Sequence, residues 1–129
     1  METIVDSSIL VAFFNEKDPS HDRALKVMLA APRPLIIHEY VFLETATVLM
    51  LRADKETADA FILNALTNAD VRMLHGSEPL FLLAIKNFMG NKTKQLSFAD
   101  SALLALSSQY KVLTFDDALN RAIKKKAQS

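Results

Sequence analysis

Apolar positions along the chain form short runs and longer stretches with helical spacing, separated by polar and turn-forming residues. Four short runs, rich in β-branched and other apolar residues, predict strands at TIVDSS (3–8), PRPLIIHE (32–39), VRMLH (71–75) and KVLTF (111–115). The first run ends in a turn at residues 6–8, which are polar and turn-forming. Seven longer segments have the length and spacing of helices: 9–18, 19–31, 39–52, 55–69, 78–90, 97–110 and 116–128. Strands that alternate with helices predict a parallel sheet with helices on both faces.

Local signals support several of these boundaries. Pro19 and Ser20 open the second helix, and Gly90 ends the fifth before the loop GNKTKQ (90–95). The segment EYVFLETATVLMLR (39–52) is apolar almost throughout, so we expect it to be buried on more than one side. In open parallel sheets, ligands bind beyond the carboxyl ends of the strands, near the point where the strand order reverses. We therefore expect functional side chains at that edge.

The composition predicts one compact domain over residues 1–129. The absence of cysteine excludes disulfides and thiolate metal sites. The sequence has neither the basic start and long apolar run typical of signal peptides nor an uncharged apolar stretch of about 18 residues. We therefore expect a cytoplasmic protein that does not interact with a membrane.

Charge is balanced overall but unevenly placed. Fifteen basic and fifteen acidic residues cancel, so the net charge gives no global argument for nucleic-acid binding. Lys86, Lys92 and Lys94 lie close together in the sequence, and residues 124–126 are all lysine. We interpret the second run as cations that complement the dipole of the last helix.

Two aspartates stand where predicted strands end. Asp6 follows the first strand, and Asp116 follows the last, with Asp117 directly behind it. If both strands run in the same direction, these carboxylates lie at one edge of the sheet. The alternative is structural, because aspartate at a strand-to-helix junction is a good helix N-cap.

Glu44 lies inside an apolar helix without a neighbouring cation. The residues three and four positions away are Tyr40, Val41, Thr47 and Val48. An ionised carboxylate in apolar surroundings needs a partner, or its pKa rises and it takes up a proton. The alternatives for Glu44 are an ion pair with a distant residue such as Arg52, or a partly solvated helix face.

Asp100 lies in the first turn of the helix LSFADSALLAL (96–106). With Ser97 it has the S-x-x-D spacing of a capping box, which explains this pair of residues by itself. The capping box does not explain why Asp6, Glu44 and Asp116 also stand at element starts or on apolar faces.

Four carboxylates in one place require a counter-charge. Two unit charges about 4 Å apart repel by roughly 4 kcal/mol at an effective dielectric constant of 20. Oxygen ligands without cysteine suit Mg²⁺ or Mn²⁺. Such an ion can activate a water and neutralise charge on a phosphodiester. The combined pattern therefore predicts a metal-dependent hydrolase of phosphate esters.

Four motifs resemble those of PIN-domain ribonucleases, in order and spacing, over residues 4–120. They are IVDSSILVAFF, EYVFLETATVL, LSFADSALLALS and VLTFDDAL. The compact length resembles the VapC-type toxins of toxin–antitoxin pairs. The resemblance implies a three-layer α/β/α sandwich with a parallel sheet of four to five strands. It also implies cleavage of RNA with Mg²⁺ or Mn²⁺, a homodimer, and a protein antitoxin that covers the site.

The resemblance also assigns roles to residues. It implies that Asp6, Glu44, Asp100 and Asp116 hold the metal, and that Ser8 and Thr114 assist them. The spacing T-x-D favours Asp116 over Asp117. Leu119 stands where such toxins often have an aromatic residue. Our candidates for RNA contacts are Lys86, Lys92, Lys94 and Arg121.

Other functions fit less well. A haloacid-dehalogenase-like phosphatase would have a second aspartate at position 8, which is Ser8, and a response-regulator receiver would have paired acids after the first strand. The histidines, at positions 21, 38 and 75, are too scattered for a ligand set. A PIN-like fold that binds RNA or protein without catalysis stays open as the alternative.

Overall fold

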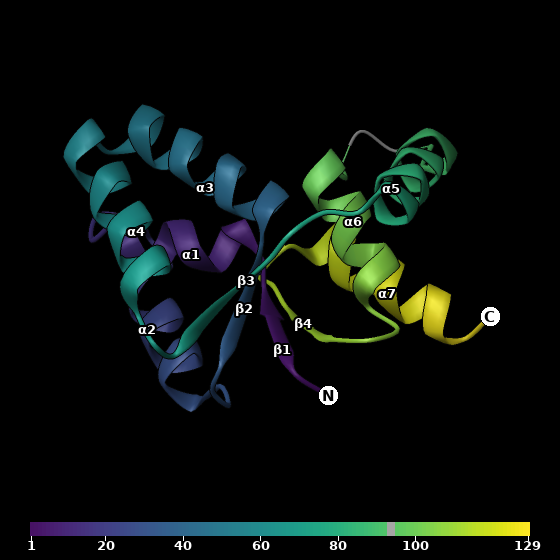
Figure 1. Cartoon of the computed structure of the whole chain (residues 1–129), viewed down its shortest axis with the longest axis horizontal. Helices are drawn as coiled ribbons and strands as arrows, with labels where there is room; N and C mark the ends of the chain where they lie inside the picture. The colour runs from purple at the N-terminus through teal and green to yellow at the C-terminus, as the bar shows by residue number, and fades with distance from the viewer. Residues whose placement is uncertain (93–94) are drawn as a thin grey trace.

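The computed structural model describes residues 1–92 and 95–129 (Figure 1). Its four strands are all parallel, and their order in the sheet is β3-β2-β1-β4. The strands are β1 (Thr3–Val5), β2 (Leu35–His38), β3 (Val71–Leu74) and β4 (Lys111–Leu113). The predicted parallel sheet is therefore confirmed, and all four predicted strands contribute to it.

Helices cover both faces of the sheet. In the described part of the chain they are α1 (Ser7–Phe14), α2 (His21–Ala30), α3 (Glu39–Arg52), α4 (Lys55–Thr67), α5 (Glu78–Gly90), α6 (Phe98–Leu106) and α7 (Asp117–Ala127). Figure 1 shows α1–α4 on one side of the strands and α5–α7 on the other. This is the expected three-layer α/β/α sandwich.

The strand order creates a crevice between β1 and β4. From β1 the chain builds β2 and then β3 on one side, and it crosses over afterwards to place β4 on the other side of β1. The register pairs Thr3 with Leu35 and also with Lys111, so the carboxyl ends of β1 and β4 lie next to each other. This reversal is where a ligand site is expected in an open parallel sheet.

The first helix begins earlier than its apolar pattern predicted. We expected a turn at residues 6–8 and a helix from Ile9, but α1 starts at Ser7. The carbonyl of Asp6 accepts hydrogen bonds from the backbone N–H groups of Ile9 and Leu10, at 3.2 and 3.3 Å. The first turn of α1 therefore includes Ser7 and Ser8, which brings both hydroxyls to the carboxyl end of β1.

Burial of α3 differs from the expectation drawn from its composition. Val41, Thr45 and Leu49 are buried at helical spacing, whereas Leu43 and Leu51 are 61% and 75% exposed. The prediction that this helix is buried on more than one side is wrong, because its apolar residues exceed the single face that packs on the core. In the described ranges, we find no helix with the length and apolar character needed to cross a bilayer.

Candidate active site

A cleft of about 800 Å³ opens at the carboxyl ends of β1 and β4. Five acids line it: the four predicted acids Asp6, Glu44, Asp100 and Asp116, and also Asp18, whose Oδ1 accepts from the backbone N–H of Ser20 at 2.8 Å. The four predicted acids come from the end of β1, the middle of α3, the first turn of α6 and the residue before α7. The fold thus brings together carboxylates that are spread over more than 100 residues of sequence.

Asp6 is the most buried acid of the cleft, with 1% of its surface exposed. Its Oδ2 accepts hydrogen bonds from Ser8 Oγ at 2.9 Å and from Thr114 Oγ1 at 2.6 Å. Its Oδ1 is buried without a hydrogen-bond partner, and the side chain does not cap α1. The N-cap explanation of the Asp6 carboxylate is therefore wrong, and one oxygen is left to a further positive group.

Ser8 and Thr114 connect the ends of the neighbouring strands β1 and β4. Their hydroxyl oxygens lie 3.3 Å apart. Ser8 Oγ accepts from the backbone N–H of Phe115, and Thr114 Oγ1 accepts from that of Asp116, both at 3.0 Å. Each hydroxyl thus accepts a hydrogen bond from a backbone N–H that follows β4 and donates its own proton to Asp6. This network fixes the orientation of the Asp6 carboxylate.

Glu44 reaches the cleft from α3 and is half-buried. Its Oε2 accepts a hydrogen bond from Ser7 Oγ at 2.8 Å. The suggested ion pair with Arg52 is not among the ion pairs formed by the described residues, although Arg52 also lines the cleft. Ser7 was not among the predicted site residues, because the D-S-S motif contains two serines and the resemblance assigns a role only to the second, Ser8.

Asp100 has both the structural and the electrostatic features considered from the sequence. The capping box is present: Ser97 N–H donates to Asp100 Oδ2 at 3.0 Å, and Asp100 N–H donates to Ser97 Oγ at 3.1 Å. Burial raises the pKa of Asp100 to about 7, against the hydrogen bond from Ser97. The negative charges of Asp6, Asp116 and Glu44 add to this increase of the pKa.

Asp116 combines a cap with a place in the cleft. Its Oδ1 accepts from the backbone N–H of Leu119 at 2.9 Å, which makes it the N-cap of α7. Asp117, in the first turn of α7, is exposed and does not line the cleft. Leu119, the residue at the position often aromatic in VapC-type toxins, is fully buried in the core.

The chemistry of the donor set fits a hard divalent cation. The unpartnered Oδ1 of Asp6 and the raised pKa of Asp100 both indicate missing positive charge. Within the described ranges, however, no three His, Asp or Glu side chains are placed to hold one metal ion together. Glu44, Asp100 and Asp116 accept hydrogen bonds from Ser7, Ser97 and Leu119 respectively.

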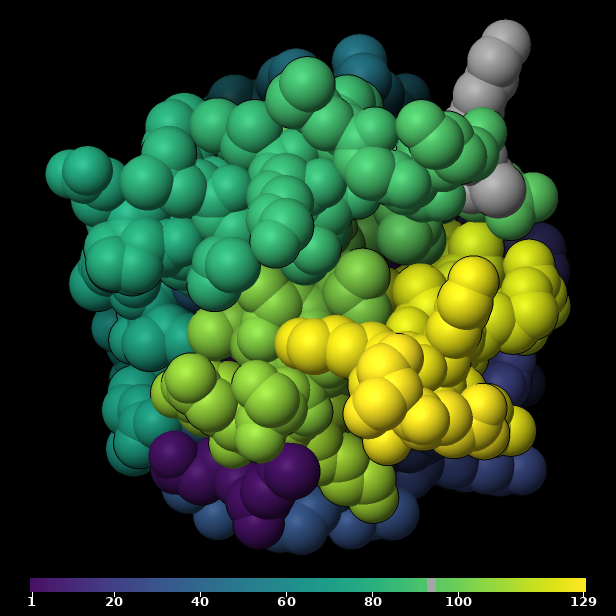
Figure 2. Space-filling model, turned by 90° about the vertical axis from the view of Figure 1, so that its right-hand side faces the viewer, coloured from purple at the N-terminus to yellow at the C-terminus, as the bar shows by residue number. Residues whose placement is uncertain are grey.

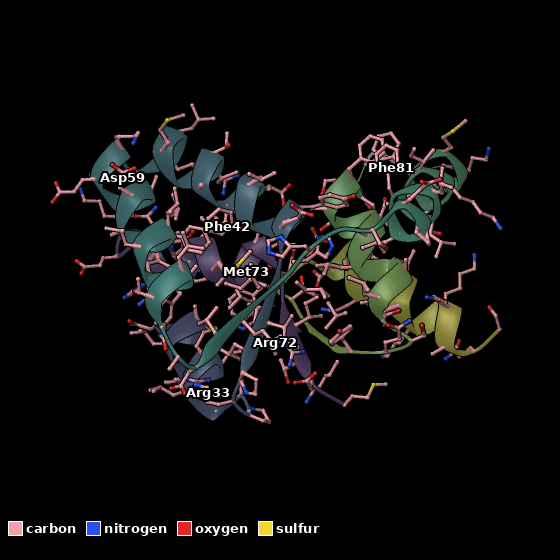
Figure 3. All side chains as sticks on the ribbon, viewed as in Figure 1. Arg33, Phe42, Asp59, Arg72, Met73 and Phe81 are labelled. Carbon is pink, nitrogen blue, oxygen red and sulfur yellow. The ribbon has the colours of Figure 1, made fainter. Side chains whose placement is uncertain are left out.

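An acid outside the cleft shows the contrast. Asp59 lies at the outer side of α4 (Figure 3), where it forms an exposed ion pair with Lys55 one helical turn away. Such a surface pair contributes about 0.3–0.5 kcal/mol and needs no further partner. In contrast to Asp59, none of the acids that line the cleft forms an ion pair with a Lys, Arg or His of the described residues.

Basic residues near the cleft differ in part from our candidates. Arg23 of α2 lies over the ring of Phe115, 4.1 Å from its centroid, and Phe115 lines the cleft beside Arg52. Neither Arg23 nor Arg52 is among the residues that we predicted to contact RNA. Of the four candidates, Lys86, Lys92 and Arg121 are exposed, and Lys94 lies outside the described residues.

Comparison with known proteins identifies the family. The model of the PIN domain matches residues 3–125, and the chain therefore belongs to the PIN-domain family. The resemblance stated from the four sequence motifs is confirmed. No curated protein matches the sequence significantly.

Two solved structures have the same fold. VapC20 from Mycobacterium tuberculosis, a toxin that cleaves the sarcin–ricin loop, has a TM-score of 0.85 and 24% identity, with 94% of this chain and 95% of that chain covered. VapBC2 from Rickettsia felis, bound to a DNA fragment from its promoter, has a TM-score of 0.62 and 16% identity, covering 95% and 93%. At these identities the likeness shows the fold, which is that of VapC-type PIN domains.

Proposed function

We propose that this protein is a metal-dependent endoribonuclease and the toxin of a toxin–antitoxin pair. The observation that carries the proposal is Asp6, a buried carboxylate with one oxygen unpartnered, in a cleft that four more acids line. Membership of the PIN-domain family supports the same chemistry. VapC20, whose fold is similar, is a toxin that cleaves the sarcin–ricin loop.

In this proposal Asp6, Glu44, Asp100 and Asp116 hold Mg²⁺ or Mn²⁺. When bound, the ion would neutralise charge on the phosphodiester and would lower the pKa of water, so that the nucleophilic hydroxide is available at neutral pH. Ser8 and Thr114 keep Asp6 in place through the hydrogen bonds to its Oδ2. Before metal binding, a pKa of about 7 lets Asp100 exchange a proton in the neutral range, so metal affinity should increase with pH.

Exposed apolar side chains support the partners that we propose, an antitoxin and a second copy of the chain. Leu43 and Leu51 on α3, Leu63 and Leu66 on α4, and Phe81 on α5 are between 52% and 75% exposed. Leu63 and Leu66 are three residues apart, so they are neighbours on one face of α4. Exposed apolar patches mark protein interaction sites. Light scattering of the purified protein tests the homodimer directly.

Cleavage of RNA with and without metal tests the nuclease. We expect the protein to cut single-stranded, transfer or ribosomal RNA with Mn²⁺ or Mg²⁺ and to stop when EDTA is added. Asp100→Asn should reduce cleavage strongly, whereas Asp117→Asn, the same change outside the cleft, should not. Equal rates for Asp100→Asn and the parent would mean that the capping box is the whole role of Asp100.

Thermal unfolding with and without Mn²⁺ distinguishes the nuclease from the non-catalytic alternative. A nuclease should gain thermal stability with Mn²⁺, because an ion that binds only the folded state shifts the unfolding equilibrium. A PIN-like module that binds RNA or protein without a metal should show no such gain and no cleavage. That result would overturn the proposed function.

A further inference from the structure

A second groove, of about 540 Å³, lies between α5, α6 and α7. Figure 2 looks onto this side of the molecule and shows the surface hollowed between α5 and the yellow α7. Three lysines line the groove, Lys86 from α5 and Lys125 and Lys126 from α7. Among the described residues that line it there is no Asp or Glu side chain.

Lys126 is fixed in this groove by the neighbouring helix. Its Nζ donates to the carbonyl oxygens of Leu104 and Ala105, at 2.7 and 3.2 Å, near the carboxyl end of α6. As we interpreted them, the lysines at 124–126 all lie in the last turn of their own helix; Lys126 also binds the last carbonyls of α6. An ammonium group has three donors, so one N–H of Lys126 is left for a ligand.

The groove and the acidic cleft share two of their lining residues. Asn91 and Leu96 line both of them, on the segments that follow α5 and precede α6. The basic residues are also concentrated in the part of the chain that forms this groove. Residues 78–129 contain eight Lys or Arg and four Asp or Glu, whereas residues 1–77 contain seven Lys or Arg and eleven Asp or Glu. A polyanion that enters the acidic cleft therefore has a cationic surface on one side of it.

We propose that this groove binds the phosphodiester backbone of RNA next to the cleavage site, with Lys86 and Lys125 as phosphate contacts. The inference rests on the proposed nuclease function, since it assigns a binding surface to the part of the RNA strand that extends out of the cleft. Four carboxylates repel a phosphate chain, so a neutral protein needs a separate cationic surface to hold its substrate. Lysines bind phosphate as point charges without reading the base sequence.

The test compares two double variants with the same loss of charge. The double variant Lys86→Gln/Lys125→Gln removes the proposed contacts and keeps Lys126, with its hydrogen bonds to the carbonyls of α6, unchanged. Lys26→Gln with Lys111→Gln is the control, because both lysines are exposed and line neither the groove nor the cleft. Binding of a single-stranded RNA is measured in the Asp6→Asn background with EDTA, at several salt concentrations, so that cleavage does not interfere.

We expect the groove variant to bind roughly tenfold more weakly than the control at low salt. Its log–log salt slope should be smaller by about 1.4, since each phosphate contact on a single strand contributes about 0.7. With Asp6 restored, KM for a long RNA should increase while kcat stays near that of the control variant.

Each other outcome overturns the inference in a recognisable way. If the parent cleaves RNA and the two double variants bind it equally, the groove is not the backbone site and the nuclease proposal stands. If the groove variant changes only the oligomeric state, the groove is a protein contact. If the parent neither binds nor cleaves RNA, the proposed function fails and the groove assignment fails with it.

Discussion

The ends of β1 and β4 look alike in sequence and behave differently in the structure. Each strand is followed by an aspartate that precedes a helix, Asp6 before α1 and Asp116 before α7. Asp116 caps its helix through Oδ1, whereas Asp6 does not cap and leaves its Oδ1 buried and unpartnered. The same local signal thus gives an ordinary N-cap in one case and a carboxylate prepared for a ligand in the other.

The difference arises from what surrounds each side chain. Ser8 and Thr114 both donate to Oδ2 of Asp6, so this oxygen binds two hydroxyls and no backbone N–H of α1. Asp116 lies at the half-exposed rim of the cleft, where a cap and a ligand role are compatible. The lack of a side-chain N-cap lowers the stability of a helix by about 1 kcal/mol. An aspartate with a purely structural role would cap the helix and avoid this loss.

The largest expected effect follows from neutralising Asp6. Asp6→Asn should lower RNA cleavage by on the order of 10³-fold, because the unpartnered oxygen is the one we assign to the metal. The metal-free variant should also melt at a higher temperature than the parent, since one of four crowded charges is gone. Cleavage assays and thermal unfolding in EDTA measure the two effects, and a parent-like cleavage rate would remove Asp6 from the site.

The pH dependence of stability tests the crowding of charge around Asp100. Its pKa is raised from 3.8 to about 7 in the folded protein, so the folded state keeps a proton that the unfolded state has lost. The contribution to stability is complete below about pH 4 and is lost as the pH rises through 7. For the metal-free parent we expect a loss on the order of 2–4 kcal/mol between pH 4 and pH 8.

Urea unfolding in EDTA at each pH measures this loss. The Asp100→Asn variant lacks the titrating group and should show a much smaller change over the same range. A parent whose stability increases from pH 4 to pH 8 as much as that of the variant would contradict the raised pKa.

Two substitutions at Asp116 separate its cap from its role in the cleft. Asp116→Ala should lower the unfolding free energy by about 1 kcal/mol, whereas Asp116→Asn should lower it little, because asparagine caps as well as aspartate. If Asp116 also holds the metal, both variants lose cleavage by about 10²-fold. Denaturant unfolding and cleavage assays distinguish the two roles, and normal cleavage by Asp116→Asn would leave only the cap.

The smallest expected effect concerns Ser7, whose hydroxyl donates to Glu44. Ser7→Ala should lower kcat by about tenfold through a less well oriented carboxylate, with an unfolding free energy changed by less than about 1 kcal/mol. Ser7→Thr keeps the hydroxyl and should restore most of the rate. No recovery with threonine would mean that the serine matters for packing rather than for Glu44.

The order of strands and helices follows from the sequence, because hydrophobic periodicity and capping signals act over a few residues. The periods of the apolar runs determined the four parallel strands, and the S-x-x-D spacing determined the capping box of Ser97 and Asp100. Element ends shifted by a few residues, as at α1, where the apolar pattern does not include the two serines of the first turn.

Only the tertiary structure decided which polar atoms meet. The bond from Thr114 to Asp6 joins residues 108 positions apart, and that from Ser7 to Glu44 joins residues 37 apart. The cationic groove likewise depends on how α5 and α7 pack around α6, so lysines far apart in sequence share one surface. Such contacts depend on strand order and helix packing, which local patterns restrict but do not specify. The sequence could therefore name the acids, whereas the fold determined which of their oxygens lacks a partner.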